Sequence, residues 1–387
     1  MWLMNQTFYE FFAGGGMARL GLGPDWNCLL ANDIDHKKAA VYRANFGDTQ
    51  IKCKDIYNLT SSDLPHSANL AWASFPCQDL SLAGNRNGLA GDRSGTFWGF
   101  WNVIHKLKVE CRPPQILVLE NVCGTLTSNE GRDFVEIALA ITSLGYVFGA
   151  LVIDAVHFVA QSRPRLFIVC VNERAEFPSS LVSADSSEVW HPLAVQDAVK
   201  RLPAHLAVKW KWWKLPPPRP RTATLDDVIE EDVPANTWNA EGKTKRLLGM
   251  MSKVNIEKVR VAQNANRRMI GTIYKRTRIE NGERVQRAEV RFDGIAGCLR
   301  TPGGGSSRQT IMVVIGESIR TRLLSIREAA RLMGVPDSYS IPLNYNDGYH
   351  VFGDGLAVPA VAFLRENLLE PIAKFAARGH AVHIAAE

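Results

Sequence analysis

The segment TFYEFFAGGG (residues 7–16) decides the fold class of this chain. Its first six residues are mostly apolar or aromatic, which is typical of a buried strand, and a glycine-rich turn follows at once. Similar runs follow at CLLAN (28–32), LAWASF (70–75), ILVLEN (116–121) and LFIVCV (166–171). Segments with helical spacing separate these runs. Strands that alternate with helices predict an α/β fold with a parallel, doubly wound, Rossmann-like sheet.

One of these helical segments carries clear end signals. Asp35 is a candidate N-cap, and Gly47 is placed to end the helix. Near the other end of the chain, Ser325 and Glu328 form a capping-box pattern that predicts the start of a short helix. A last helix with an apolar stripe is predicted around Pro371, which we expect to bend it.

The regular alternation stops after about residue 172, and the sequence predicts three parts. Residues 1–174 form the first domain, and residues 175–300 form a smaller, mostly irregular or β domain. Residues 301–387 return to complete the first domain. The second part contains the stretch KWKWWKLPPPRPR (209–221), which cannot continue a helix, and a strand is predicted again at IMVVI (311–315).

The composition narrows the class of protein. Hydrophobic residues make up 46% of 387 residues, which is enough for a large core. No apolar run approaches the roughly 20 residues that cross a bilayer, and the first residues lack the features of a signal peptide. Seven cysteines without a CxxC pair indicate neither a disulfide framework nor a zinc site. We therefore expect no metal and a reducing, cytoplasmic setting.

Positive charge is concentrated in one region. The whole chain has a net charge of +6, but residues 243–300 contain 15 Lys and Arg against 5 Asp and Glu. A basic block of this kind suits contact with a phosphate backbone, and a solvated basic surface is the alternative. Four arginines of this block are candidates for base or phosphate contact: Arg267, Arg268, Arg276 and Arg278.

Residues at the ends of the first strands suit an adenosine-bearing cofactor. The glycines at 14–16 would let a ligand approach the backbone closely. Asp33, at the end of the second strand, could accept hydrogen bonds from a ribose diol, and Asp55 could accept one from an adenine amino group. A tight turn without a ligand, or a nicotinamide dehydrogenase, would show similar features.

Three complementary reactive groups follow later strands. Cys77 stands in SFPCQD (74–79) as a candidate nucleophile, and Glu120 follows the run ILVL as a candidate acid. Arg163 and Arg165, in QSRPR (161–165), supply guanidinium groups. Methylation of cytosine at C5 needs a thiolate that adds at C6, an acid with a raised pKa at N3, and a donor to O2. A buried cysteine, a helix cap and surface ion pairs are the alternatives for each residue taken singly.

FFAGGG, PCQ, ENV and QSRPR, in this order and spacing, resemble the motifs of the C5-cytosine DNA methyltransferase family. REAARLMGVPDSY (327–339) and FGDGLAVPAV (352–361) resemble its last two motifs. The resemblance implies a DNA (cytosine-5-)-methyltransferase that uses S-adenosylmethionine. It also implies a covalent adduct between Cys77 and C6 of a cytosine flipped out of duplex DNA.

The resemblance gives each part of the chain a role. Residues 1–174 correspond to the catalytic and cofactor-binding domain, and residues 175–300 to the target-recognition domain. The implied catalytic residues are Cys77, Glu120, Arg163 and Arg165. The implied cofactor-binding residues are Phe12, Gly14, Gly16, Asp33, Ile34, Asp55, Ile56 and Pro76. Gln78 and Ser81 join the four arginines above as expected DNA contacts.

The chain departs from the family pattern at three places. Met17 stands where a glycine is frequent, and Ile34 stands where an aromatic residue often stacks on adenine. Asp354 and Gly355 replace the usual Asn-Ser pair. We expect the first two to alter cofactor packing and the third to alter cofactor affinity or rate, in an active enzyme.

Several alternatives stay open at this stage. The same motifs would suit a tRNA cytosine methyltransferase or a catalytically silent DNA-binding module. A nicotinamide oxidoreductase would not need PCQ. The resemblance implies a monomer that acts on a short duplex sequence, without a membrane partner. Both a solitary enzyme and one with a cognate restriction endonuclease acting separately are compatible with the sequence.

Overall fold

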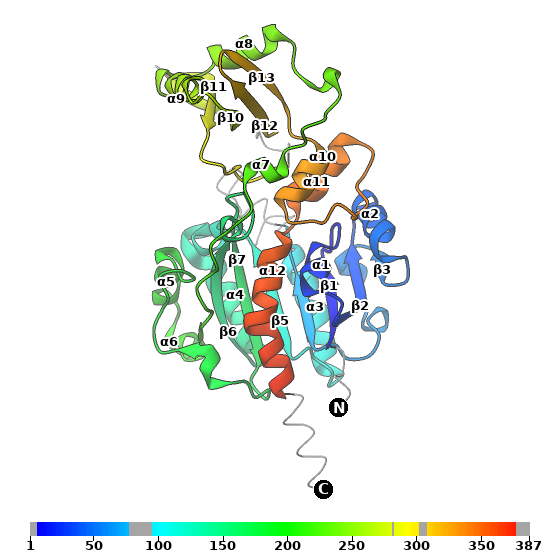
Figure 1. The fold of residues 1–387 in the computed structure, drawn as a ribbon. Helices are drawn as coiled ribbons and strands as arrows, with labels where there is room; N and C mark the ends of the chain where they lie inside the picture. Colours follow the sequence, from blue (N-terminus) through cyan, green and yellow to red (C-terminus); the bar gives the residue numbers. More distant parts are fainter. Residues whose placement is uncertain (1–5, 77–94, 281, 302–307, 377–387) are drawn as a thin grey trace. The chain divides into compact units, whose positions relative to one another are not determined.

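The computed structural model describes residues 6–76, 95–280, 282–301 and 308–376 (Figure 1). Contacts between Cα atoms divide the chain into two compact units. Unit 1 comprises Met1–Asp154, Pro164–Pro218 and Val358–Glu387, and unit 2 comprises Ala155–Arg163 and Arg219–Ala357. Cys77, Gln78 and Ser81 lie outside the described residues. No helix within the described ranges is long and apolar enough to span a bilayer.

Unit 1 contains a seven-stranded sheet in the order β3-β2-β1-β4-β5-β7-β6. Its strands are β1 (Gln6–Phe11), β2 (Trp26–Asp33), β3 (Ile51–Cys53), β4 (Leu70–Ala73), β5 (Ile116–Asn121), β6 (Tyr146–Asp154) and β7 (Pro164–Asn172). The five strands expected from the apolar runs are confirmed, as is the α/β class, while β3 and β6 were not among the predicted runs.

One strand departs from the expected parallel arrangement. β7 runs antiparallel to both of its neighbours, β5 and β6. Only residues 155–163 connect β6 to β7, which is too short for the crossover that parallel neighbours need. The sheet is therefore mostly, but not wholly, parallel.

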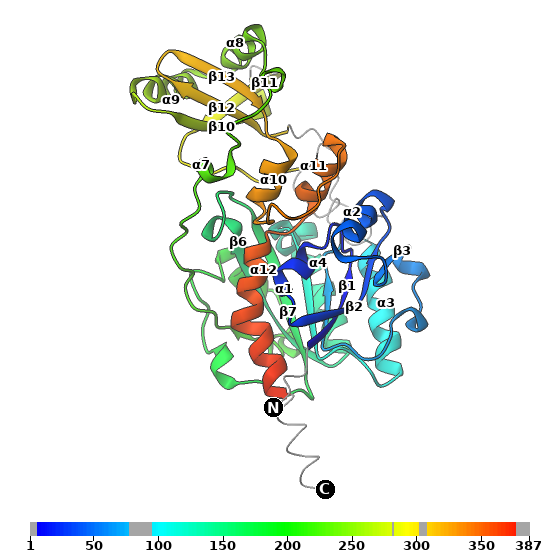
Figure 2. The ribbon, with the colours of Figure 1, turned by 45° about the vertical axis from the view of Figure 1, so that its right-hand side comes forward.

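Helices cover both faces of this sheet, as a doubly wound fold requires (Figures 1 and 2). The helices of unit 1 are α1 (Met17–Leu22), α2 (His36–Phe46), α3 (Thr96–Val109), α4 (Arg132–Ser143), α5 (Leu193–Lys200), α6 (Ala204–Ala207) and α12 (Val358–Leu364). Alternate residues of β1 point to opposite faces of the sheet. Glu10 accepts hydrogen bonds from residues of α1 and α2, whereas Phe11 packs edge-on against Phe100 of α3.

The predicted helix signals are confirmed. Asp35 caps α2 by accepting from the amides of Lys37 and Lys38, and Gly47 lies at its C-cap with φ 82°. Helix α12 continues as a π-helical turn at Arg365–Leu369. This irregular turn comes directly before Pro371, which has no N–H to donate to the preceding turn.

Unit 2 is built on a four-stranded antiparallel sheet in the order β11-β10-β12-β13. Its strands are β10 (Met269–Glu280), β11 (Glu283–Arg291), β12 (Thr310–Ile315) and β13 (Ser318–Leu323). Its helices are α7 (Leu225–Val228), α8 (Glu241–Gly249), α9 (Lys253–Asn264), α10 (Ile326–Leu332) and α11 (Tyr345–Asp354). The capping box of Ser325 and Glu328 begins α10 as predicted.

The compact units differ in extent from the predicted domains. Residues 175–218 belong to unit 1, which also holds the two-stranded sheet of β8 (Val182–Ser183) and β9 (Trp212–Trp213). Residues 301–357 belong to unit 2, because β12 pairs with β10 rather than with the large sheet. The second unit is thus not a simple insertion between residues 175 and 300.

Candidate functional site

The glycine turn after β1 is tied to the end of β2 through Asp33. The Gly14 amide donates to Asp33 Oδ2 at 2.8 Å, and the Asp35 amide donates to Asp33 Oδ1 at 2.8 Å. Burial raises the pKa of Asp33, while these two amides and Lys38 oppose that shift. Each carboxylate oxygen keeps a further lone pair, so Asp33 can still accept from a diol.

The two glycines expected to bind cofactor have different surroundings. Gly14 has φ 55°, and among the described residues no atom beyond its chain neighbours lies within 4 Å of where its Cβ would stand. Gly16 has φ 81°, and a Cβ there would come within 2.4 Å of Phe46. Gly14 can therefore border a ligand, whereas Gly16 is required for packing against α2.

The remaining predicted cofactor residues differ in their exposure to solvent. Phe12 adopts φ 57°, a strained value for a residue with a side chain. Ile34 is 64% exposed and can offer an apolar surface, while Ile56 is buried in the core. Asp55 accepts from the amide of Tyr57 at 2.9 Å. Pro76, the last residue described before Cys77, is exposed.

A buried polar network behind the turn was missed in the sequence. Glu10 is 1% exposed; it accepts from the Arg19 amide and from the Tyr42 hydroxyl, both at 3.3 Å. The Arg19 guanidinium donates to the Tyr42 hydroxyl at 3.0 Å. Burial raises the pKa of Glu10 to about 8. An acidic residue inside the apolar run TFYEFF was the signal that could have revealed it.

This network predicts a pH-dependent stability. The folded chain holds the Glu10 proton to about pH 8, whereas an ordinary glutamate loses it near 4.5. The free energy of unfolding should therefore fall as pH rises between these values, and Glu10→Gln should remove that part of the slope. Urea denaturation of both proteins at pH 5, 6, 7 and 8 measures the difference, and parallel pH profiles would contradict it.

Glu120 and Arg165 lie together at the ends of β5 and β7. Glu120 pairs in the ladder with Phe167, which puts Arg165 diagonally opposite on the same face. Arg165 Nε lies 3.3 Å from Glu120 Oε1, and the two side chains are 16% and 9% exposed. This ion pair joins an acid to a guanidinium beside the segment that leads to Cys77.

Asn121 connects that pair to the cysteine-bearing segment. Its side-chain amide donates to the Phe75 carbonyl at 3.3 Å, two residues before Cys77. Cys123 is close by, but burial raises the pKa of its thiol to about 11, with Arg165 opposing. Cys123 therefore stays protonated near neutral pH and is a poor nucleophile.

Arg163 is placed differently from Arg165. It is 1% exposed, and its guanidinium donates to the carbonyls of Leu299, Gly353 and Gly355, each at 2.8 Å. It also donates to Cys298 Sγ at 3.2 Å. These bonds hold two separate segments of unit 2 together, so the geometry favours a positioning role over contact with a base.

Gln161 also holds backbone segments of unit 2 together. Its side-chain oxygen accepts from the Leu299 amide at 2.9 Å, and its side-chain amide donates to the Leu332 carbonyl at 2.8 Å. Asp354, which departs from the family pattern, accepts a hydrogen bond from the Thr301 hydroxyl. That bond anchors the chain where the segment 302–307 begins.

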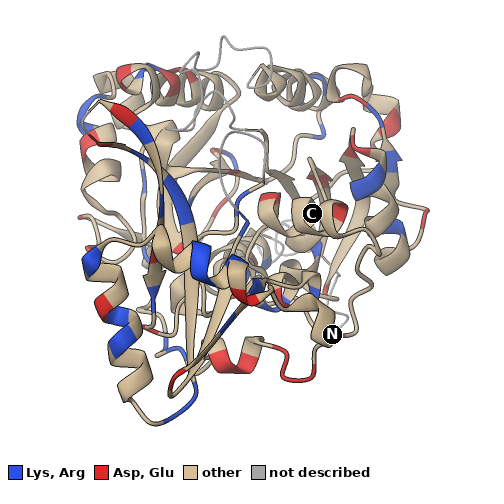
Figure 3. Cartoon of the chain, turned by 90° about the horizontal axis from the view of Figure 1, so that it is seen from above, with Lys and Arg blue, Asp and Glu red and all other residues tan. Residues whose placement is uncertain are grey.

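The four arginines expected to contact DNA lie in unit 2, and three of them are in ion pairs. Arg268 pairs with Asp226 and Glu231, while Arg276 and Arg278 both pair with Glu289. Arg267 is exposed. Figure 3 shows Lys and Arg positions lying among Asp and Glu positions. The local excess of basic residues is thus partly neutralised within the protein.

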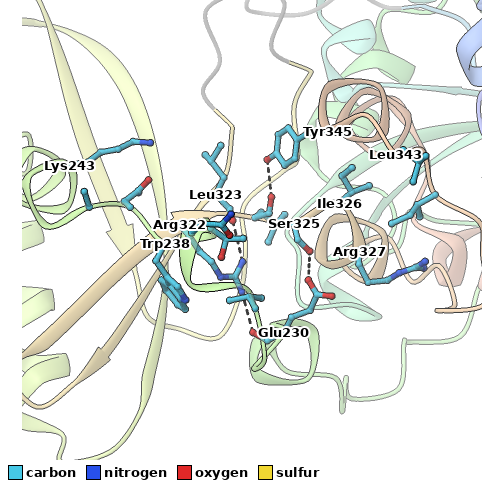
Figure 4. Close-up of a pocket in the computed structure, with 17 residues that line it drawn as sticks. Glu230, Trp238, Lys243, Arg322, Leu323, Ser325, Ile326, Arg327, Leu343 and Tyr345 are labelled. Carbon is cyan, nitrogen blue, oxygen red and sulfur yellow. Dashed lines mark hydrogen bonds between the residues drawn. The ribbon is translucent and has the colours of Figure 1, made fainter.

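A cavity of about 700 Å³ in unit 2 contains none of the predicted site residues (Figure 4). Its lining includes Trp238, Leu343 and Tyr345, with Glu230 bonded to Ser325 beneath. The described residues also contain no cluster of His, Cys, Asp and Glu that could hold a metal ion. Of the predicted site residues that the structure describes, Asp33, Glu120 and Arg165 lie at strand ends of unit 1.

Known proteins resemble this chain over most of its length. The family model of C-5 cytosine-specific DNA methylases matches residues 6–370. Type II methyltransferase M.HpaII of Haemophilus parainfluenzae is 26% identical, with 95% of this chain and 90% of the relative covered. M.HhaI of Haemophilus parahaemolyticus is 25% identical, with 95% of both covered. The S. pombe Dnmt2 methyltransferase structure shares the fold, with TM-score 0.58, 16% identity, and 95% and 99% coverage.

Proposed function

This chain belongs to the family of C-5 cytosine-specific DNA methylases, and we propose that it methylates a flipped-out cytosine with Cys77, Glu120 and Arg165 as its catalytic groups. It is a DNA cytosine-5 methyltransferase. The observation that carries the proposed site is the Glu120–Arg165 pair, placed by β5 and β7 beside the segment that leads to Cys77.

The proposed mechanism uses each group at one atom of the base. The Cys77 thiolate adds to C6, which makes C5 nucleophilic. Glu120 holds a proton at N3 while charge develops there, and Arg165 donates to O2 and orients the acid. A base or water then removes the proton from C5, and Cys77 leaves by β-elimination. Arg163 is proposed as a positioning residue, because it fixes backbone segments of unit 2.

We propose S-adenosylmethionine as the methyl donor. When bound, it supplies an electrophilic methyl group on a sulfonium. The room beside Gly14 among the described residues, the unused lone pairs of Asp33 and the exposed side chain of Ile34 suit an adenosine. Asp55 remains the proposed acceptor for the adenine amino group, with Phe12, Ile56 and Pro76 as supporting positions.

Replacement of Asp33 by asparagine tests the cofactor site. A charged acceptor is lost, so we expect the dissociation constant of S-adenosylmethionine to rise about tenfold to a hundredfold. Isothermal titration without DNA measures this change. Asp48→Asn is the matched control, because Asp48 pairs only with Arg43 among the described residues. Equal affinities of the two variants would remove Asp33 from the site.

The proposed substrate is a short sequence in duplex DNA, read by unit 2. The basic residues of 243–300 support contact with phosphates, including Arg267, Arg268, Arg276 and Arg278. Gln78 and Ser81 remain proposed DNA contacts. The type II relatives favour a role in DNA modification beside a separate restriction endonuclease. We propose a monomer in a reducing, cytoplasmic setting, supported by the free thiols of the described cysteines.

A further inference from the structure

The hairpin of β10 and β11 extends beyond the sheet of unit 2. β12 pairs with β10 only from Met269 to Ile273, whereas β11 pairs with β10 as far as Glu280. We call residues 274–280 and 283–289 the outer ribbon. Toward its tip the side chains are exposed on both faces, as Arg278 on one face and Thr277 on the other show, whereas Ala288 at its base is buried. A ribbon exposed on both faces contributes little to a hydrophobic core.

One face of the outer ribbon brings like charges together. Arg276 lies directly opposite Arg287, and Arg278 follows two residues along on the same face. Arginines facing each other across a ladder destabilise the strand pair unless an anion lies between or beside them. Glu280 forms an ion pair with Arg287. The positive charges of Arg276 and Arg278 then need another anion nearby.

Glu289 supplies that compensation for both arginines. Arg276 Nε lies 3.4 Å from Glu289 Oε2, and Arg278 Nε donates to Glu289 Oε1 at 3.1 Å. One carboxylate is thus shared by two guanidinium groups, whose side chains are 55% and 50% exposed. The ion pairs are accessible to solvent and weak enough to be exchanged for another anion.

We infer that Glu289 holds Arg276 and Arg278 in the DNA-free protein and gives them up to DNA, so that it limits binding to DNA that lacks the target sequence. The inference rests on the proposed contact between these arginines and DNA. A two-stranded ribbon fits the major groove of duplex DNA, where arginines bind phosphates and guanine edges. Non-specific binding must then compete with Glu289 for both arginines, and this competition lowers its affinity.

Replacement of Glu289 by glutamine tests the inference. Glu283→Gln is the matched control, because it removes the same charge from the same hairpin and Glu283 makes no ion pair with the described residues. We expect Glu289→Gln to bind non-target duplex DNA about two- to fivefold more tightly than Glu283→Gln. The slope of log affinity against log salt should steepen by about one for each added phosphate contact. Methylation of near-target sites should rise relative to the target.

The outcomes separate this inference from the proposed DNA contact. The double variant Arg276→Gln, Arg278→Gln should weaken DNA binding. If it does, and Glu289→Gln still binds non-target DNA as Glu283→Gln does, the role of Glu289 is overturned. If the double variant binds DNA as the unmodified protein does, the DNA contact of these arginines is overturned instead. Equal thermal unfolding temperatures among the variants exclude a folding defect as the cause.

Discussion

Replacement of Cys77 by serine should lower the rate of methyl transfer by at least about a thousandfold while leaving cofactor binding intact. A hydroxyl at this position is far less able than a thiolate to add to C6 of the base and to leave again. Turnover of duplex DNA and titration of S-adenosylmethionine measure the two properties separately.

Duplex DNA that contains 5-fluorocytosine gives a direct view of the same step. Fluorine at C5 cannot be removed as a proton, so elimination stops and the protein should remain covalently joined to the DNA in denaturing gels. Cys111→Ser is the control, because Cys111 is an exposed free thiol. Normal turnover by Cys77→Ser, or its capture by the fluorinated DNA, would refute the assignment of Cys77.

The second large effect should come from Glu120. Glutamine keeps the size and the polar contact with Arg165 but cannot hold a transferable proton at N3. We expect Glu120→Gln to lower kcat by about a hundredfold to ten-thousandfold, with a smaller change in KM for DNA. Steady-state kinetics over a range of pH should show the loss throughout the range.

The control for this variant is Glu130→Gln. Glu130 is an exposed residue that pairs with Arg132 at the surface of unit 1. A Glu120 variant that retains at least a third of the kcat of this control would show that the acid at N3 is another group. A loss confined to KM would instead assign Glu120 to substrate binding.

Much of unit 1 could be predicted because its signals are local. The apolar runs form strands of a sheet whose two faces are covered, Asp35 begins α2 with its side-chain cap, and Gly47 ends it in a conformation that glycine favours. The antiparallel direction of β7 was not predicted, since it follows from the short connection at 155–163 and from pairing with distant β5.

The sequence predicts the residue types of the proposed site, but the contacts that each of them makes appear only in the structure. Arg163 and Arg165 stand two apart in one motif, yet Arg165 meets Glu120 while Arg163 binds backbone carbonyls near 299 and 353. The carbonyls that Arg163 binds lie more than 100 residues away in the sequence. Compact unit 2 extends past residue 300 for a similar reason, because β12 hydrogen-bonds to β10 and no local pattern records that pairing.

Transfer of a tritiated methyl group from S-adenosylmethionine to duplex DNA, single-stranded DNA and bulk tRNA is the most direct test of the account. Bisulfite sequencing of the labelled nucleic acid locates the modified base. The account predicts label in duplex DNA, at C5 of cytosine within one short sequence. Label confined to tRNA, or no label in any substrate although the methyl donor binds, would contradict it.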